Sequence, residues 1–299
     1  VITLLGGVDI ITEGSEKYVD PGVTAGDDRD GDLTVKVVTG GDEVDTAVLG
    51  VYNITYDVTD AAGNKAVQIV RKVTVVDTTA PLVVLNGASE VIVEGGEIYT
   101  DAGGTSTDSF DGDVTASITV DNPVNTSKLG DYLVTFTAKD VSNNQGAITR
   151  KVSVVDTTAP VITLAGGASV TIASGSTFID PGATAVDIID GDVTSEIVAD
   201  LTLVDTSKAG TYKVTYNVSD SSGNTAVELS RNVIVSADVI APVITLVGDV
   251  SVAVEIGNAY TDAGATALDN VDGDITSSIV IVNPVDTSKP GEYVVTFNV

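Results

Sequence analysis

The stretch YKVTYNV (residues 212–218) alternates large apolar side chains with polar ones at every position. A period of two predicts a β-strand with one buried and one exposed face. The same register recurs three more times, and each copy follows a Gly-x-Tyr start that fits a tyrosine corner. The buried faces are expected at Tyr52, Ile54, Tyr56 and Val58; Tyr132, Val134, Phe136 and Ala138; Tyr212, Val214, Tyr216 and Val218; and Tyr293, Val295, Phe297 and Val299. These aromatic side chains are therefore predicted to be core residues.

An acidic hexapeptide with the spacing D-x-x-D-G-D sets the length of the repeat. It appears as DDRDGD (27–32), DSFDGD (108–113), DIIDGD (187–192) and DNVDGD (269–274). Its middle aspartate falls at positions 30, 111, 190 and 272, so successive copies are 81, 79 and 82 residues apart. About 80 residues are enough for a domain with its own core. We therefore expect four domains, at residues 1–79, 80–158, 159–240 and 241–299, the last without its closing strand.

Each repeat carries about seven short segments rich in Val, Ile and Thr, separated by turn signals. This spacing predicts an all-β fold of four tandem immunoglobulin-like β-sandwich domains in an elongated array, the last one incomplete. The chain has no Cys, so packing has to replace the disulfide that links the two sheets of an antibody domain.

The composition excludes several classes of function. With 14 basic and 43 acidic residues and a net charge of −29, the chain is expected to avoid nucleic acid and anionic membranes and to attract cations. No apolar run is long enough to span a bilayer, so we expect no direct membrane insertion of this segment. The chain has neither His nor Cys, and a catalytic acid pair is not expected in four tandem copies. We therefore predict that it is not an enzyme.

The acidic hexapeptide has three interpretations. Asp-Gly suits a tight turn, and a run of acids often forms a solvated face. The third interpretation is a calcium loop, because calcium takes six to eight oxygen ligands and a glycine lets a short loop bend around it. Carboxylates about 5 Å apart repel by roughly 3 kcal/mol per pair at an effective dielectric near 20. Only the first copy contains a basic side chain, Arg29, so we favour a bound cation in the other three copies.

Two further sets of aspartates are expected close to the hexapeptide. In an immunoglobulin-like sandwich, its loop shares one end of the domain with a later loop that carries Asp60, Asp140 or Asp220. The linkers carry Asp77, Asp156 and Asp238, each four residues before the proline that opens the next repeat. We expect shared calcium sites at the junctions, with a local Asx turn as the alternative for each linker aspartate. The candidate ligands are Asp27, Asp30, Asp32 and Asp60; Asp77 with Asp108, Asp111, Asp113 and Asp140; Asp156 with Asp187, Asp190, Asp192 and Asp220; and Asp238 with Asp269, Asp272 and Asp274.

Several stretches together resemble the immunoglobulin-like repeats of bacterial surface proteins, with hyalin repeats as relatives. They are YTDAGATALDNVDGDITSSI (260–279), VDTSKPGEY (285–293) and VTYNVSDSSGN (214–224). The junction VVDTTAP (75–81 and 154–160) is similar to the linkers of giant bacterial adhesins, whereas the third junction departs from it as SADVIAP (236–242). The resemblance implies an extracellular, calcium-binding stalk.

The function that we expect is a calcium-rigidified spacer of a bacterial or archaeal cell-surface protein or adhesin, with calcium ions and the neighbouring repeats as partners. One alternative is a self-assembling subunit of a surface layer or filament, whose partners are other copies of itself. The other is a carbohydrate-binding accessory module of a secreted enzyme that binds a surface glycan. Such a module needs exposed aromatic side chains, for which the candidates are Tyr18, Tyr99, Phe178 and Tyr260.

Overall fold

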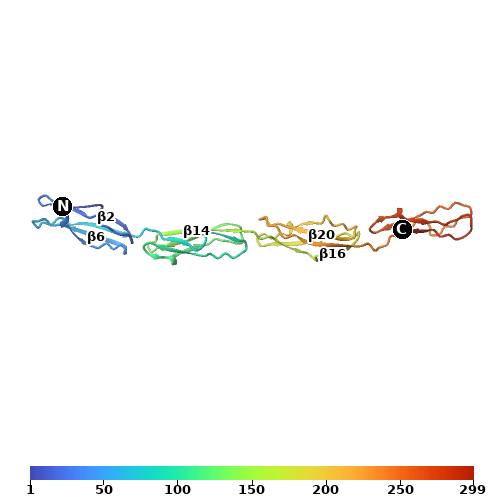
Figure 1. The fold of residues 1–299 in the computed structure, drawn as a ribbon, viewed down its shortest axis with the longest axis horizontal. Coiled ribbons are helices and arrows are strands. Elements are labelled where there is room, and N and C mark those ends of the chain that lie inside the picture. Colours follow the sequence, from blue (N-terminus) through green and yellow to red (C-terminus); the bar gives the residue numbers. More distant parts are fainter. The chain divides into compact units, whose positions relative to one another are not determined.

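The computed structural model describes all 299 residues and confirms the all-β fold class (Figure 1). The chain divides into two compact units, Val1–Asp156 and Thr157–Val299. None of its helices has the length and apolar character that a membrane crossing requires.

The first repeat consists of two sheets, with strand orders β1-β3-β4 and β2-β7-β6-β5. Neighbouring strands are antiparallel except β2 and β7, which pair in parallel with Glu13 opposite Val76. The elements are β1 (Ile2–Leu4), β2 (Asp9–Glu13), β3 (Val23–Asp27), β4 (Gly31–Asp32), the 3-10 helix η1 (Thr34–Lys36), β5 (Val38–Gly41), β6 (Gly50–Asp57) and β7 (Ile69–Val76).

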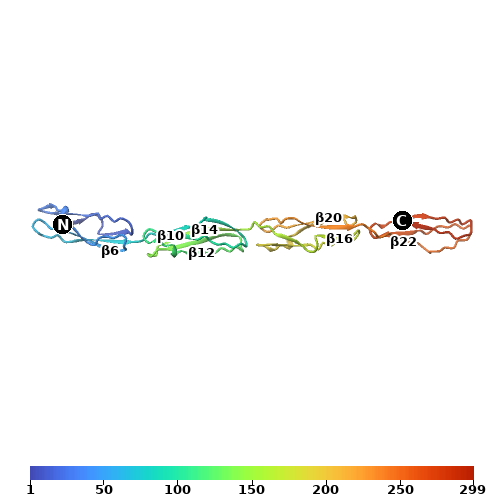
Figure 2. The same cartoon turned by 60° about the horizontal axis from the view of Figure 1, so that its bottom comes forward.

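The second repeat has the same two sheets, β11-β10-β8 and β12-β13-β14-β9. Contacts of β8 with β13 and β14 join the two sheets, and Figure 2 shows this repeat in a second view. The elements are β8 (Leu82–Leu85), β9 (Glu90–Glu94), β10 (Gly104–Asp108), β11 (Gly112–Asp113), η2 (Thr115–Ser117), β12 (Thr119–Asp121), β13 (Gly130–Lys139) and β14 (Gln145–Val155).

The second unit holds the third and fourth repeats. The third has sheets β15-β17-β18 and β16-β21-β20-β19, and the fourth has β22-β23-β24 and the pair β25-β26. Residues 251–255, the counterpart of β16, form no strand. The elements are β15 (Val161–Leu164), β16 (Ser169–Ala173), β17 (Ala183–Asp187), β18 (Gly191–Asp192), η3 (Thr194–Glu196), β19 (Val198–Asp200), β20 (Gly210–Asn217), β21 (Leu229–Ser236), β22 (Val243–Leu246), β23 (Ala265–Asp269), β24 (Gly273–Asp274), η4 (Thr276–Ser278), β25 (Val280–Val282) and β26 (Thr296–Asn298).

The alternating stretch at residues 212–218 is confirmed as a half-buried strand. Val214 and Tyr216 on β20 are fully buried, and Val218 follows in the same register. The tyrosine corner also forms, because the hydroxyl of Tyr212 donates to the carbonyl of Lys208 at 2.9 Å. Equivalent bonds run from Tyr52 to Asp45 and Val48, from Tyr132 to Lys128, and from Tyr293 to Lys289.

A buried arginine, which the sequence interpretation missed, connects the two sheets in each of the first three repeats. Arg71 on β7 is fully buried, forms an ion pair with Asp20 and donates to the carbonyls of Gly7 and Gly22. Its guanidinium lies 5.5 Å from the ring centroid of Tyr56, a cation–π distance. Arg150 with Asp101 and Arg231 with Asp180 repeat the arrangement. These polar bonds between the sheets occur in a chain that has no disulfide.

Three of the four aromatic residues that we considered for glycan binding pack against the core, and the fourth bonds a neighbouring aspartate. Tyr18, Tyr99 and Phe178 pack against the buried clusters, and half-buried Tyr260 donates its hydroxyl to Asp262. In the second repeat the hydroxyl of Tyr99 reaches Asp101 beside Phe136, whereas in the third Tyr216 reaches Asp180 beside Phe178. The first repeat has tyrosines at both of these positions, Tyr18 and Tyr56. The hydroxyl of Tyr56 donates to Asp20, whereas that of Tyr18 is buried without a hydrogen-bond partner.

Candidate metal centre

The acidic hexapeptide of the second repeat forms the tight turn of the β10–β11 hairpin. Asp108 pairs with Gly112, whose φ of +75° explains the need for glycine. Asp108 Oδ1 accepts the backbone N–H groups of Phe110 at 2.7 Å and Asp111 at 3.0 Å. The turn interpretation therefore describes the backbone correctly, but it uses only one carboxylate oxygen of Asp108.

Hydrogen bonds join this hairpin to the loop between β13 and β14 and to the preceding linker. Asp111 Oδ2 accepts the N–H of Val141 at 2.8 Å. In the same loop, Asn144 donates its side-chain amide to Asp140 at 2.8 Å and to the carbonyl oxygen of Asp77 at 3.1 Å. Three segments far apart in the sequence are thus fixed at one end of the second repeat.

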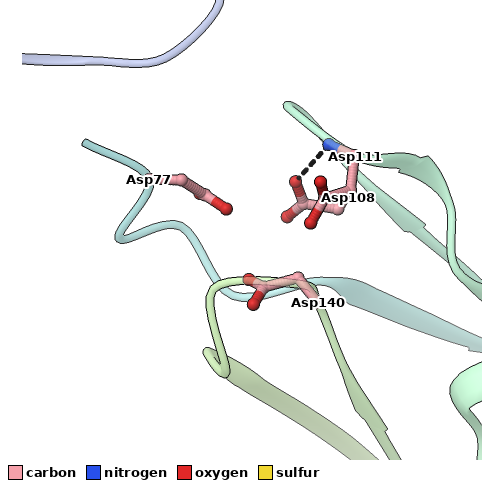
Figure 3. A group of neighbouring side chains, drawn as sticks. All are labelled: Asp77, Asp108, Asp111 and Asp140. Atoms are coloured by element: carbon pink, nitrogen blue, oxygen red, sulfur yellow. Dashed lines mark hydrogen bonds between the residues drawn. The ribbon is translucent and has the colours of Figure 1, made fainter. Parts of the chain in front are cut away.

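Four carboxylates converge where these segments meet. One oxygen each from Asp77, Asp108, Asp111 and Asp140 lies within 4.8 Å of the others. Figure 3 shows the carboxylate of Asp77 pointing from the linker toward those of Asp108 and Asp111, with Asp140 across from them. Asp77, Asp108 and Asp140 are only 8%, 7% and 7% exposed. The structure thus brings together four of the five aspartates predicted for this junction, and their role as metal ligands stays a prediction.

Two oxygens in this cluster are buried without a hydrogen-bond donor, Asp77 Oδ2 and Asp108 Oδ2. Buried polar atoms nearly always have partners, so such an oxygen indicates a missing ion or water. Burial raises the pKa of Asp77, and the charges of Asp108 and Asp140 raise it further, against opposing hydrogen bonds from Ser142 and Thr79. A cluster of carboxylate oxygens suits a hard divalent cation such as calcium or magnesium. The residues present therefore fit a cation.

The third aspartate of each hexapeptide lies outside this arrangement, which corrects our expectation for its position. Asp113 Oδ1 accepts the N–H of Thr115 at 2.9 Å, at the start of η2. Because this bond turns the carboxylate toward the 3-10 helix, Asp113 does not join the four carboxylates. Asp32, Asp192 and Asp274 make the same bond to Thr34, Thr194 and Thr276.

The first copy of the hexapeptide has the same local bonds but no convergent cluster. Asp27 Oδ1 accepts the N–H groups of Arg29 and Asp30, and Asp30 Oδ2 accepts that of Ala61 at 2.6 Å. Asp27 and Asp60 are half-buried rather than buried, and neither belongs to a group of converging carboxylates.

In the second unit, the third repeat builds the same pair of loops. Asp187 and Asp220 are buried, with carboxylate oxygens within 4.8 Å of each other, and Asp187 Oδ2 has no hydrogen-bond partner. Asp190 accepts the N–H of Ser221 at 2.6 Å. Asp156 is the last residue of the first unit, so its role as a fellow ligand stays a prediction.

The third junction does not follow the predicted pattern. Asp269 is buried, but Asp238 and Asp272 are exposed and form no carboxylate cluster with it. Asp238 Oδ1 instead accepts the N–H of Ile240 at 3.0 Å, which is the local Asx turn that we considered as the alternative. The structure therefore does not bring together the residues of the shared site predicted here.

Comparison with known proteins identifies the family. The family described as "Bacterial surface protein, Ig-like domain" matches residues 2–75, 83–154, 162–235 and 244–299. The chain belongs to this family. Its four repeats are thus surface-type immunoglobulin-like domains, as the sequence resemblance implied.

Two curated relatives extend over most of the chain. "Pesticidal crystal protein Cry22Aa" of Bacillus thuringiensis is 35% identical over 297 residues, and an uncharacterized 81.3 kDa protein of Acholeplasma phage L2 is 32% identical over 237 residues. These alignments take in 93% and 74% of this chain but only 39% and 31% of the relatives. Among solved structures, "Protocadherin Gamma B2 extracellular cadherin domains 3-6" aligns with 93% of this chain and 84% of its own, at 14% identity and a TM-score of 0.33.

Proposed function

We propose that the chain is a calcium-stiffened spacer of a bacterial surface protein, acting outside the cell and without catalytic activity. The observation that supports this most strongly is the burial of Asp77, a linker residue, among three carboxylates of the following repeat. Asp77 directly follows β7, the last strand of the first repeat. A cation held by Asp77 and by Asp108 would therefore connect two successive domains.

The chemistry of the cluster favours calcium over other ions. Calcium prefers carboxylate and carbonyl oxygens and tolerates irregular geometry, whereas magnesium demands a near-ideal octahedron. Extracellular calcium modules have Kd values of about 10⁻⁴–10⁻³ M. At a free calcium concentration ten times the Kd, each site adds about 1.4 kcal/mol to the stability of the folded chain. Such sites suit an environment rich in calcium.

The carbohydrate-binding alternative loses its main support, since its four candidate aromatic residues contact the core or a neighbouring carboxylate.

The spacer proposal can be tested directly. Thermal unfolding and small-angle X-ray scattering are measured with 5 mM calcium, on the order of ten times a weak module's Kd, and with a chelator. We expect the chelator to lower the melting temperature and broaden the range of particle dimensions. Unchanged values of both would refute the proposal.

A further inference from the structure

A second set of bonds holds the first linker from the side of the preceding repeat. Glu13 is the last residue of β2 and lies opposite Val76, the last residue of β7. Its Oε1 accepts the N–H groups of Thr78 at 2.6 Å and Thr79 at 3.0 Å. The two threonine hydroxyls also donate to the Glu13 carboxylate, at 3.0 and 2.9 Å. One carboxylate thus accepts four hydrogen bonds from two consecutive linker residues.

These bonds surround the cation ligand Asp77. Asp77 lies between Val76, which is fixed in the sheet, and Thr78, which is bound by Glu13. Asp77 Oδ1 also accepts the N–H of Thr79 at 3.3 Å. With the backbone fixed on both sides of Asp77, its carboxylate points into the acidic cluster (Figure 3), and its buried Oδ2 has no hydrogen-bond donor.

We infer that Glu13 is a positioning residue for the cation site: it fixes Thr78 and Thr79, and thereby the direction of the Asp77 carboxylate. We call Glu13, Thr78 and Thr79 the latch. The inference rests on the proposed function where it concerns calcium affinity, whereas its effect on the linker does not require an ion. Residues that orient metal ligands from outside the ligand set typically change affinity by about 10- to 100-fold when they are removed.

The third junction lacks every part of the latch. Ala173 ends β16 opposite Ser236, so it occupies the position of Glu13. The two residues after the linker aspartate are Val239 and Ile240, which are 92% and 60% exposed and have no hydroxyl. This is also the junction where Asp238 is exposed and joins no cluster. The latch and the carboxylate cluster are thus present together at the first junction and absent together at the third. We therefore expect the third junction to act as a hinge.

The test uses Glu13→Ala and the control Glu16→Ala, which removes an exposed charge three residues away. The chain has no Cys, so spin labels can be placed on cysteines introduced at the equivalent exposed positions Asn53 and Leu133. In chelator, we expect Glu13→Ala to broaden the distance distribution between the labels and Glu16→Ala to leave it unchanged. In a calcium titration, Glu13→Ala should weaken the affinity about tenfold. Glu13→Gln, which keeps one acceptor oxygen, should restore part of both effects.

A matched pair of labels tests the hinge. Labels at Lys213 and Val294 should give a broad distribution across the third junction. The triple variant Ala173→Glu, Val239→Thr, Ile240→Thr should narrow it in chelator. A Glu13→Ala distribution as narrow as wild type would overturn the latch even if calcium binds. Broadening with unchanged calcium affinity would overturn the positioning role. A wild-type chain that binds no calcium would refute the proposed function, while the distances measured in chelator would still decide whether the latch exists.

Discussion

Replacing Asp77 with Asn separates electrostatic repulsion from cation binding in one substitution. Asparagine keeps an oxygen that can accept the N–H of Thr79, but it removes the negative charge of the linker. Two charges 4.8 Å apart repel by about 3 kcal/mol at an effective dielectric of 20, and Asp77 has three such neighbours. Burial raises the pKa of Asp77, and the charges of Asp108 and Asp140 act in the same direction.

The sign of the effect depends on both pH and calcium. A carboxyl whose pKa is raised on folding stabilises the fold below its unfolded pKa, and this contribution is lost as the pH rises through the folded pKa. At pH 7 in chelator, we therefore expect Asp77→Asn to increase the free energy of unfolding by about 1–3 kcal/mol. The increase should disappear below the ordinary pKa of aspartate. In calcium the wild type should be more stable than Asp77→Asn, because only the wild type keeps the full set of ligands.

Differential scanning calorimetry measures this reversal, since 1 kcal/mol shifts the melting temperature of a domain of this size by about 4–8 °C. Asp121→Asn is the control, because Asp121 is an exposed aspartate of the same repeat. If Asp77→Asn lowered the melting temperature in chelator as well as in calcium, the carboxylate would be a structural hydrogen-bond acceptor and our account of the repulsion would be wrong.

Three further predictions concern the core and the latch. Tyr56→Phe should lower the free energy of unfolding by less than about 0.5 kcal/mol, since the unpartnered hydroxyl of Tyr18 lies in the same core. Tyr216→Phe should lower it by about 1–3 kcal/mol, as measured by denaturant unfolding. Equal losses would contradict the exchange of hydroxyls between the two positions. Arg150→Met should destabilise the chain by about 3–5 kcal/mol, because it removes the counter-ion of the largely buried carboxylate of Asp101. Lys213→Ala, at an exposed ion pair, should change the stability by no more than about 0.5 kcal/mol in the same assay. Comparable losses would argue against a stabilising role of the Arg150–Asp101 pair. The N–H of Thr78 and three further donors lower the pKa of Glu13 in the folded chain below its ordinary value of 4.5. The latch is therefore fully stable above pH 4.5 and is lost as the pH falls through the lower, folded pKa. The distances between the labels in chelator should broaden only in that acid range.

The strands and repeats could be predicted because their signals are local. Alternation at residues 212–218 fixes which face of β20 is buried, and the tyrosine corner follows from Gly210 and Tyr212. The meeting of Asp77, Asp108 and Asp140 also followed from topology, since the ends of a sandwich bring the same loops together in every copy.

The failures have physical causes that leave traces in the sequence. Asp113 stands two residues before Thr115 in a D-x-T pattern that all four repeats share, and this local N–H bond decides the direction of its carboxylate. The buried arginines depend on long-range partners: Arg150 meets Asp101 across 49 residues. A lone arginine in each valine-rich closing strand was the available signal. At the third junction, the absence of the latch cannot be recognised from Ala173 in the sequence, because the parallel pairing of β16 has to be known first.

Isothermal titration of the metal-free chain with calcium tests the central claim most directly. We expect saturable binding of at least one ion per chain with a Kd of about 10⁻³ M or lower, and weaker binding of magnesium. Asp108→Asn should remove the ion bound at the first junction, whereas Asp113→Asn, at the position outside the cluster, should leave it in place. Absence of saturable calcium binding to the wild type, or equal losses in the two variants, would contradict a cation shared between linker and hairpin.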